Sequence, residues 1–223
     1  MLDGSKPGGL CYSLYMYRSG SKSTRARRLP LTLTVALLLA LLPLGAVYLA
    51  GCGSDIAGAN ESVDQGDALR TAAVDTLRKS TASVDGMVRA AAAGQALPSD
   101  QTKLATQAAI EDINNALSGL SDRDAKLSQS QSLALNPTYQ EYLGLLRDSN
   151  SKLIGTLNAA MEIPSLMEKE QYSLAGWDEI KTEKIVTQID TMQQDIEQIY
   201  SQSESLRNQA EKLRADNPGD FSG

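Results

Sequence analysis

The chain has 223 residues, two cysteines, no histidine and a formal net charge of −6. Without histidine it has no Ser–His or Cys–His nucleophilic pair, and it lacks the usual nitrogen ligand for zinc, copper and haem. The acidic balance also argues against nucleic acid as a partner, because nucleic-acid binding requires clustered Lys and Arg.

The first element along the chain is an export signal. Three arginines between positions 25 and 28 precede an uncharged run over 29–51, which ends in Leu49-Ala50-Gly51-Cys52. A basic region, an apolar stretch and small residues before a cleavage point are the parts of such a signal. Met16 gives this signal a compact beginning, and the sequence therefore predicts that translation starts there.

The end of the run resembles the lipobox of bacterial lipoproteins. The resemblance implies that Cys52 carries a diacylglyceryl group and that cleavage falls between Gly51 and Cys52. The alternative is an uncut anchor, because 29–51 is long enough to span a bilayer, for which roughly 20 apolar residues suffice. Both interpretations place the following residues on the extracytoplasmic face of a bacterial membrane, in the periplasm or at the cell surface, since the positive charges stay inside.

The signal divides the chain into a leader, 1–51, and a mature part of 172 residues. Because the leader holds six basic side chains and one acidic one, the mature part carries 15 positive and 26 negative side chains, a net of −11. Removal of Cys11 and acylation of Cys52 leave no cysteine pair for a disulfide. We expect a flexible tether at 52–60, a helical domain at 61–216 and a disordered tail at 217–223.

Hydrophobic periodicity predicts long helices over 61–93, 100–128, 137–163 and 177–215. Gly94 is expected to cap the first helix, Asn136-Pro137 to begin the third and Pro164 to end it. Apolar side chains recur at helical spacing in each segment. The last segment alternates steps of three and four residues over more than three heptads, which is typical of a supercoiled seam. The seam consists of Ile189, Met192, Ile196, Ile199, Ser203, Leu206, Ala210 and Leu213.

These segments predict an all-α fold, an elongated antiparallel four-helix bundle. Two long helical hairpins without a common core are the alternative. Ser203 in the seam, together with several alanines, predicts close approach of the helices. The seam can face another helix of the same chain or a second chain, and the pattern leaves both arrangements open.

No motif indicates catalysis or a cofactor. The sequence has no phosphate-binding glycine loop and no Glu-x-x-His pair, and its carboxylate pairs do not converge on one helix face. We therefore expect no enzyme activity, cofactor, metal ion or small-molecule substrate. Asp122 and Asp124 are the carboxylates best placed for a hard cation, although the calcium-loop pattern is absent.

Tyr172 and Trp177 flank a short linker and form a candidate recognition surface, since Tyr and Trp carry much interface energy where they are exposed. The sequence favours a lipid-anchored adaptor, scaffold or accessory subunit of the cell envelope. It would act on a protein partner or through self-association. A small-molecule-binding or sensory bundle, tethered by lipid or by an uncut anchor, is the alternative.

Overall fold

The computed structural model describes the backbone of residues 31–176 and 179–222, and the side chains of this range from residue 55 onward. The chain divides into two units, Met1–Leu44 and Gly45–Gly223. The predicted signal and lipobox, including Gly51 and Cys52, lie outside the residues whose side chains are described. In the described part, no helix is long and apolar enough to cross a bilayer.

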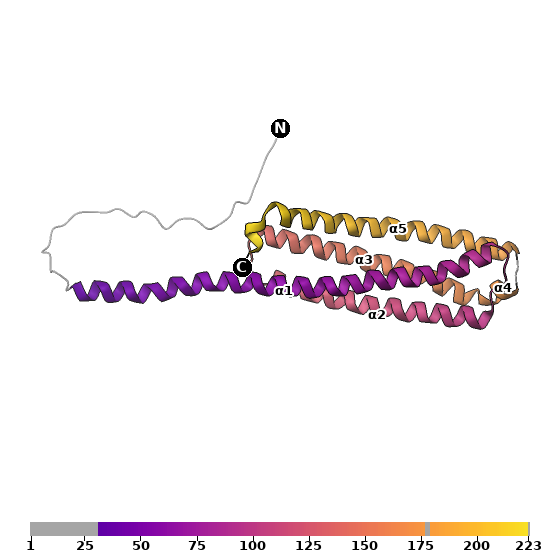
Figure 1. Ribbon diagram of the computed structural model, residues 1–223, viewed down its shortest axis with the longest axis horizontal. Coiled ribbons are helices and arrows are strands. Elements are labelled where there is room, and N and C mark those ends of the chain that lie inside the picture. Colours follow the sequence, from indigo (N-terminus) through magenta and orange to yellow (C-terminus); the bar gives the residue numbers. More distant parts are fainter. Residues whose placement is uncertain (1–30, 177–178, 223) are drawn as a thin grey trace, which may run out of the picture. The chain divides into compact units, whose positions relative to one another are not determined.

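Most of the described residues are helical, and none of them lies in a strand (Figure 1). The helices are α1 (Leu31–Ala92), α2 (Ser99–Gln131), α3 (Pro137–Lys169), α4 (Gln171–Gly176) and α5 (Glu179–Asp216), and a 3-10 helix, η1 (Pro218–Phe221), follows. Within the second unit, α1, α2, α3 and α5 lie side by side as an antiparallel bundle, with α4 at one end and η1 at the other (Figure 1). The predicted all-α bundle is confirmed.

The predicted helix boundaries are correct at two turns. Gly94 has a φ of 80°, and Gln95 N–H donates to the Ala90 carbonyl while Gly94 N–H donates to Ala91. These two bonds form a Schellman cap, which glycine favours because it adopts a left-handed backbone without strain. At α3 the Asn136 side chain accepts from Tyr139 N–H at 2.8 Å, and Pro137 occupies the first turn.

Three boundary predictions are wrong. Residues 55–60 of the predicted tether belong to α1, because Ala59 continues its buried stripe. The predicted disordered tail forms η1, because Phe221 is buried between Tyr139 and Tyr142 and its carbonyl accepts from Asn60. Pro164 does not end α3, which continues to Lys169.

The interior consists of two hydrophobic cores, and each contains residues of α1, α2, α3 and α5. The core at the α4 end includes Ile113, Leu153 and Leu174, and the core at the η1 end includes Leu143 and Phe221. Since all four long helices share both cores, the alternative of two separate hairpins is excluded.

Alternate positions of the α5 heptad seam are buried inside this bundle, whereas Met192, Ile199, Leu206 and Leu213 are partly exposed. Ile189, Ser203 and Ala210 are at most 1 % exposed. Gly155 of α3 lies close enough to α5 that an added Cβ would stand 3.7 Å from Ile199 Cγ2, which agrees with the predicted close approach. The buried half of the seam therefore packs in cis.

Candidate functional site

A layer of polar side chains separates the two hydrophobic cores, and Arg123 of α2 lies at its centre. The Arg123 side chain is fully buried. Its Nη2 donates to Asp67 Oδ1 of α1 at 2.9 Å, and its Nη1 donates to Asn150 Oδ1 of α3 at 3.2 Å. Asn150 Nδ2 in turn donates to the Leu120 carbonyl of α2 at 2.9 Å. One arginine thus connects three helices.

Arg123 fits this position because the facing residue of α1 is Gly66. A Cβ on Gly66 would stand 3.2 Å from Arg123 Cγ, a distance shorter than ordinary van der Waals contact. The missing side chain makes room for the aliphatic stem of the arginine, which crosses the interior before its guanidinium reaches Asp67. Gly66 and Arg123 are therefore a matched pair.

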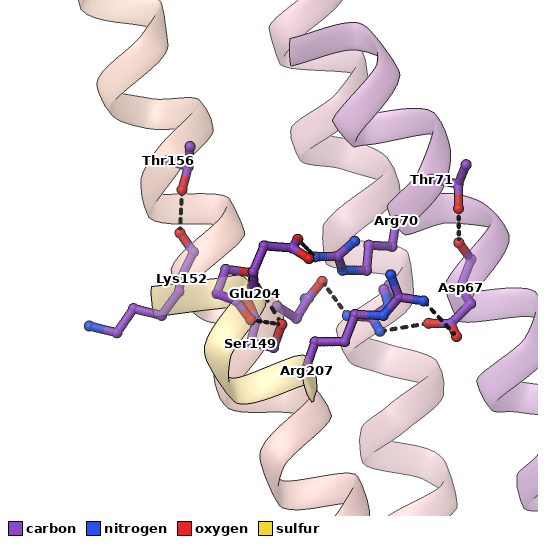
Figure 2. Close-up of polar contacts among 11 residues, drawn as sticks. Asp67, Arg70, Thr71, Ser149, Lys152, Thr156, Glu204 and Arg207 are labelled. Carbon is purple, nitrogen blue, oxygen red and sulfur yellow. Dashed lines mark hydrogen bonds and ion pairs between the residues drawn. The ribbon is translucent and has the colours of Figure 1, made fainter. Parts of the chain in front are cut away.

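The interface between α1 and α5 contains the remaining charges of the layer (Figure 2). Arg70 of α1, which is 3 % exposed, donates through Nη2 to Glu204 Oε1 of α5. Arg207 Nη2 of α5 lies 3.9 Å from Asp67 Oδ2. Asp67 consequently faces two arginines from two different helices.

Two buried serines close the layer between α3 and α5 (Figure 2 labels Ser149). Ser149 Oγ donates to the Ser203 carbonyl at 2.9 Å, and Ser203 Oγ lies 2.8 Å from the Ser149 carbonyl. The two hydroxyl oxygens are 3.1 Å apart. Both residues are 0 % exposed, so small side chains and polar contacts hold these two helices together at the layer.

Burial and pairing act against each other in the electrostatics of the layer. Burial lowers the pKa of Arg123, although Asp67 opposes the shift through its charge and hydrogen bond. Burial also acts to raise the pKa of Glu204, but the hydrogen bond and charge of Arg70 outweigh it, so the pKa of Glu204 is lowered. The lowered pKa of Glu204 favours its charged form.

The composition of the layer suits structure better than catalysis. Three arginines face two carboxylates, and the Nε atoms of all three arginines are buried without a hydrogen-bond partner. Arginine is not a proton acceptor at neutral pH. Among the described residues, no three His, Cys, Asp or Glu side chains are grouped to hold a metal ion. Asp124 instead forms a two-pronged ion pair with Arg147, at 3.0 and 3.2 Å.

The residues of the layer were not predicted from the sequence as a site, except that Ser203 was placed in the seam. A signal existed at Arg123, because it follows Leu120 by three residues and precedes Leu127 by four. That spacing is typical of a core position. A charged residue there marks a polar interruption of the core.

The predicted recognition surface lies at the α4 end of the bundle. Tyr172 is 78 % exposed, and Trp177 lies outside the described residues. Two further large apolar side chains are exposed in the described part: Leu104 in the second turn of α2 and Ile180 at the start of α5. All three exposed residues belong to the same end of the bundle (Figure 1).

Comparison of the chain with protein-family models, with curated proteins and with solved structures found no match.

Proposed function

We propose that the chain is a lipid-anchored, extracytoplasmic helical bundle that acts by binding a protein partner at its α4 end. The observation that carries this proposal is the exposure of Leu104, Tyr172 and Ile180 at that end. Large apolar side chains that remain exposed at one end of a bundle mark a candidate interaction site. Tyrosine in particular contributes strongly to binding energy.

The position of the proposed anchor agrees with this role. Residues 52 and 92 both belong to α1, and 40 helical residues span about 60 Å at 1.5 Å per residue. Asn60, eight residues after Cys52, contacts η1 at the opposite end from α4. A lipid on Cys52 would therefore hold the η1 end near the membrane and present Tyr172 away from it.

The interior favours a protein partner over a small ligand. The cavity between the helices in the described core has a volume of about 20 Å³, whereas ligand pockets measure about 300–1,000 Å³. Larger grooves, of about 670 Å³ between α2 and α3 and about 370 Å³ between α1 and α5, are open to the outside. In the second groove the floor residues Val74, Leu77 and Ile196 are themselves at least 91 % buried, so they offer little area to a ligand.

Site-specific photocrosslinking in native membranes tests the partner-binding end. A photoreactive residue at position 172 or 180 should capture a discrete protein, whereas the same residue at exposed position 209, near the η1 end, should not. The double change Tyr172→Ser and Ile180→Ser should abolish capture from position 104 without loss of helix content. Equal capture from 172 and 209 would refute recognition at the α4 end.

The anchor is tested separately by acyl labelling. Cys52→Ala should abolish incorporation of a labelled fatty acid and leave the uncleaved precursor, while Cys11→Ala should change neither. Unchanged labelling of the Cys52→Ala variant would refute the lipid anchor, whatever the crosslinking result.

A further inference from the structure

A small cavity lies inside the bundle beside Pro164 of α3. Its volume is about 20 Å³, and its apolar walls include Val84, Ile113 and Ile196. Side chains with hydrogen-bonding groups also line it, from Ser80 and Thr81 of α1 and Gln193 of α5, and Ala160 of α3 is a further lining residue. A space of this size holds one water molecule, which needs about 10–15 Å³, and excludes an organic ligand.

Ser80 contributes a hydroxyl group that no protein atom satisfies. The residue is 5 % exposed, and its Oγ has no hydrogen-bond partner. Its neighbour Thr81 donates to the carbonyl four residues earlier, at Leu77, and Thr156 does the same to Lys152. Ser80 Oγ makes no such hydrogen bond to the carbonyl four residues earlier. A buried hydroxyl left unpaired is destabilising, so a partner in the cavity would be favourable.

Pro164 creates an acceptor at the same place. Proline has no N–H, and inside a helix it leaves the carbonyl four residues earlier without its usual donor. In α3 this carbonyl belongs to Ala160, which lines the cavity together with Pro164. Gln193 also lines the cavity. Because its Nε2 donates to Asp85 Oδ1 at 2.6 Å, its Oε1 is the side-chain atom that can accept a hydrogen bond from a water there.

We infer that this cavity is a binding site for a single structural water molecule, which links α1, α3 and α5. The water accepts a hydrogen bond from Ser80 Oγ and donates to the Ala160 carbonyl and to Gln193 Oε1. Three bonds are the usual number for a buried water. The site explains how a proline is accommodated inside α3, near its C-terminal end, since the water replaces the missing backbone donor.

The test compares Ser80→Ala with Ser83→Ala in the full chain, because Ser83 is exposed on the same helix. A high-resolution crystal structure of the unchanged protein should show one ordered water within hydrogen-bond distance of Ser80 Oγ and the Ala160 carbonyl. Nuclear magnetic resonance should show a long-lived water contact at the neighbouring amides. Ser80→Ala should lower the urea midpoint relative to Ser83→Ala and weaken that contact.

A dry cavity gives the opposite result. If no water is present, Ser80→Ala removes an unpaired hydroxyl and raises the urea midpoint, and the crystal shows no density at the site. Either finding would overturn the inference. Pro164→Ala supplies an independent check, because it restores the N–H donor to Ala160 and should displace the water from that carbonyl.

Discussion

Replacing Arg123 by an apolar residue is expected to destabilise the protein less than removing the carboxylate of its partner Asp67, although the two form one ion pair. Asp67→Ala removes the carboxylate that Arg123 reaches at 2.9 Å and leaves a fully buried guanidinium with only a neutral amide partner. Breaking a buried pair in this way costs about 3–5 kcal/mol. Because Asp67 is 28 % exposed and retains some water, we expect the lower end, about 3 kcal/mol.

Arg123→Met removes the buried charge itself and keeps an unbranched apolar stem beside Gly66. It also removes a guanidinium whose Nε is unpaired, while the Asp67 carboxylate remains in contact with water and near Arg207. The lost bond to Asn150 opposes this gain by about 1 kcal/mol. The free energy of unfolding should therefore change by no more than about 1 kcal/mol, in either direction.

Urea unfolding followed by far-UV circular dichroism measures both variants, with Asp64→Ala, an exposed change on the same helix, as the control. We expect Asp67→Ala to lose the most stability and the control to stay within about 0.5 kcal/mol of the unchanged protein. If Arg123→Met destabilises as much as Asp67→Ala, the reasoning that the buried guanidinium is itself a cost is refuted.

Three further predictions concern the ends and the glycines of the bundle. Phe221→Ala should lower the free energy of unfolding by about 3 kcal/mol in the same urea assay, because the centroid of its ring lies 4.8 and 5.1 Å from those of Tyr139 and Tyr142. An unchanged urea midpoint would show that η1 contributes nothing to stability. Burial raises the pKa of Tyr139 and of Tyr142 to about 12, against 10.0 for an unperturbed tyrosine. As the pH rises the tyrosines of the unfolded state ionise first, so the free energy of unfolding should fall between pH 10 and 12. The same fall in a variant with both tyrosines changed to Phe would contradict this. Gly119→Ala should stabilise the protein by up to about 1 kcal/mol, since the added Cβ would stand at an ordinary 3.8 Å from Leu69 Cδ2. Gly66→Ala should not stabilise it, since the buried Arg123 side chain leaves no room for a Cβ. Equal gains in the two variants would refute the matched fit of Gly66 and Arg123.

The sequence predicted the helices well because their determinants are local. The cap at Gly94 and the start at Asn136 follow from residues within one turn, and the heptads of α5 follow from a repeat along one helix. The errors arise where distant contacts decide. Phe221 is ordered because tyrosines more than 70 residues away surround it, and Pro164 stays inside α3 because tertiary packing outweighs its helix-breaking tendency.

The polar layer could not be derived from one sequence for a related reason. Asp67, Asn150 and Glu204 each look like an ordinary solvated side chain on a helix, and nothing in the local pattern says that their positions along three helices coincide. Arg123 occupies a core spacing, but its partner depends on the relative register of α1 and α2. Register is a property of the assembled bundle, because neighbouring heptads offer nearly equivalent apolar stripes.

Because the apolar stripes of neighbouring heptads are nearly equivalent, the polar layer contributes to fixing the register of the helices. Alanine- and leucine-rich stripes tolerate a shift of one heptad, since a similar apolar side chain replaces the one that moves away. Arg123 does not tolerate it, because such a shift would move its guanidinium away from Asp67 and into one of the two apolar cores. An unpaired buried charge costs about 3–5 kcal/mol, which is a large fraction of the 5–15 kcal/mol by which a typical domain is stable. The layer thus favours one register of the helices at little gain in stability.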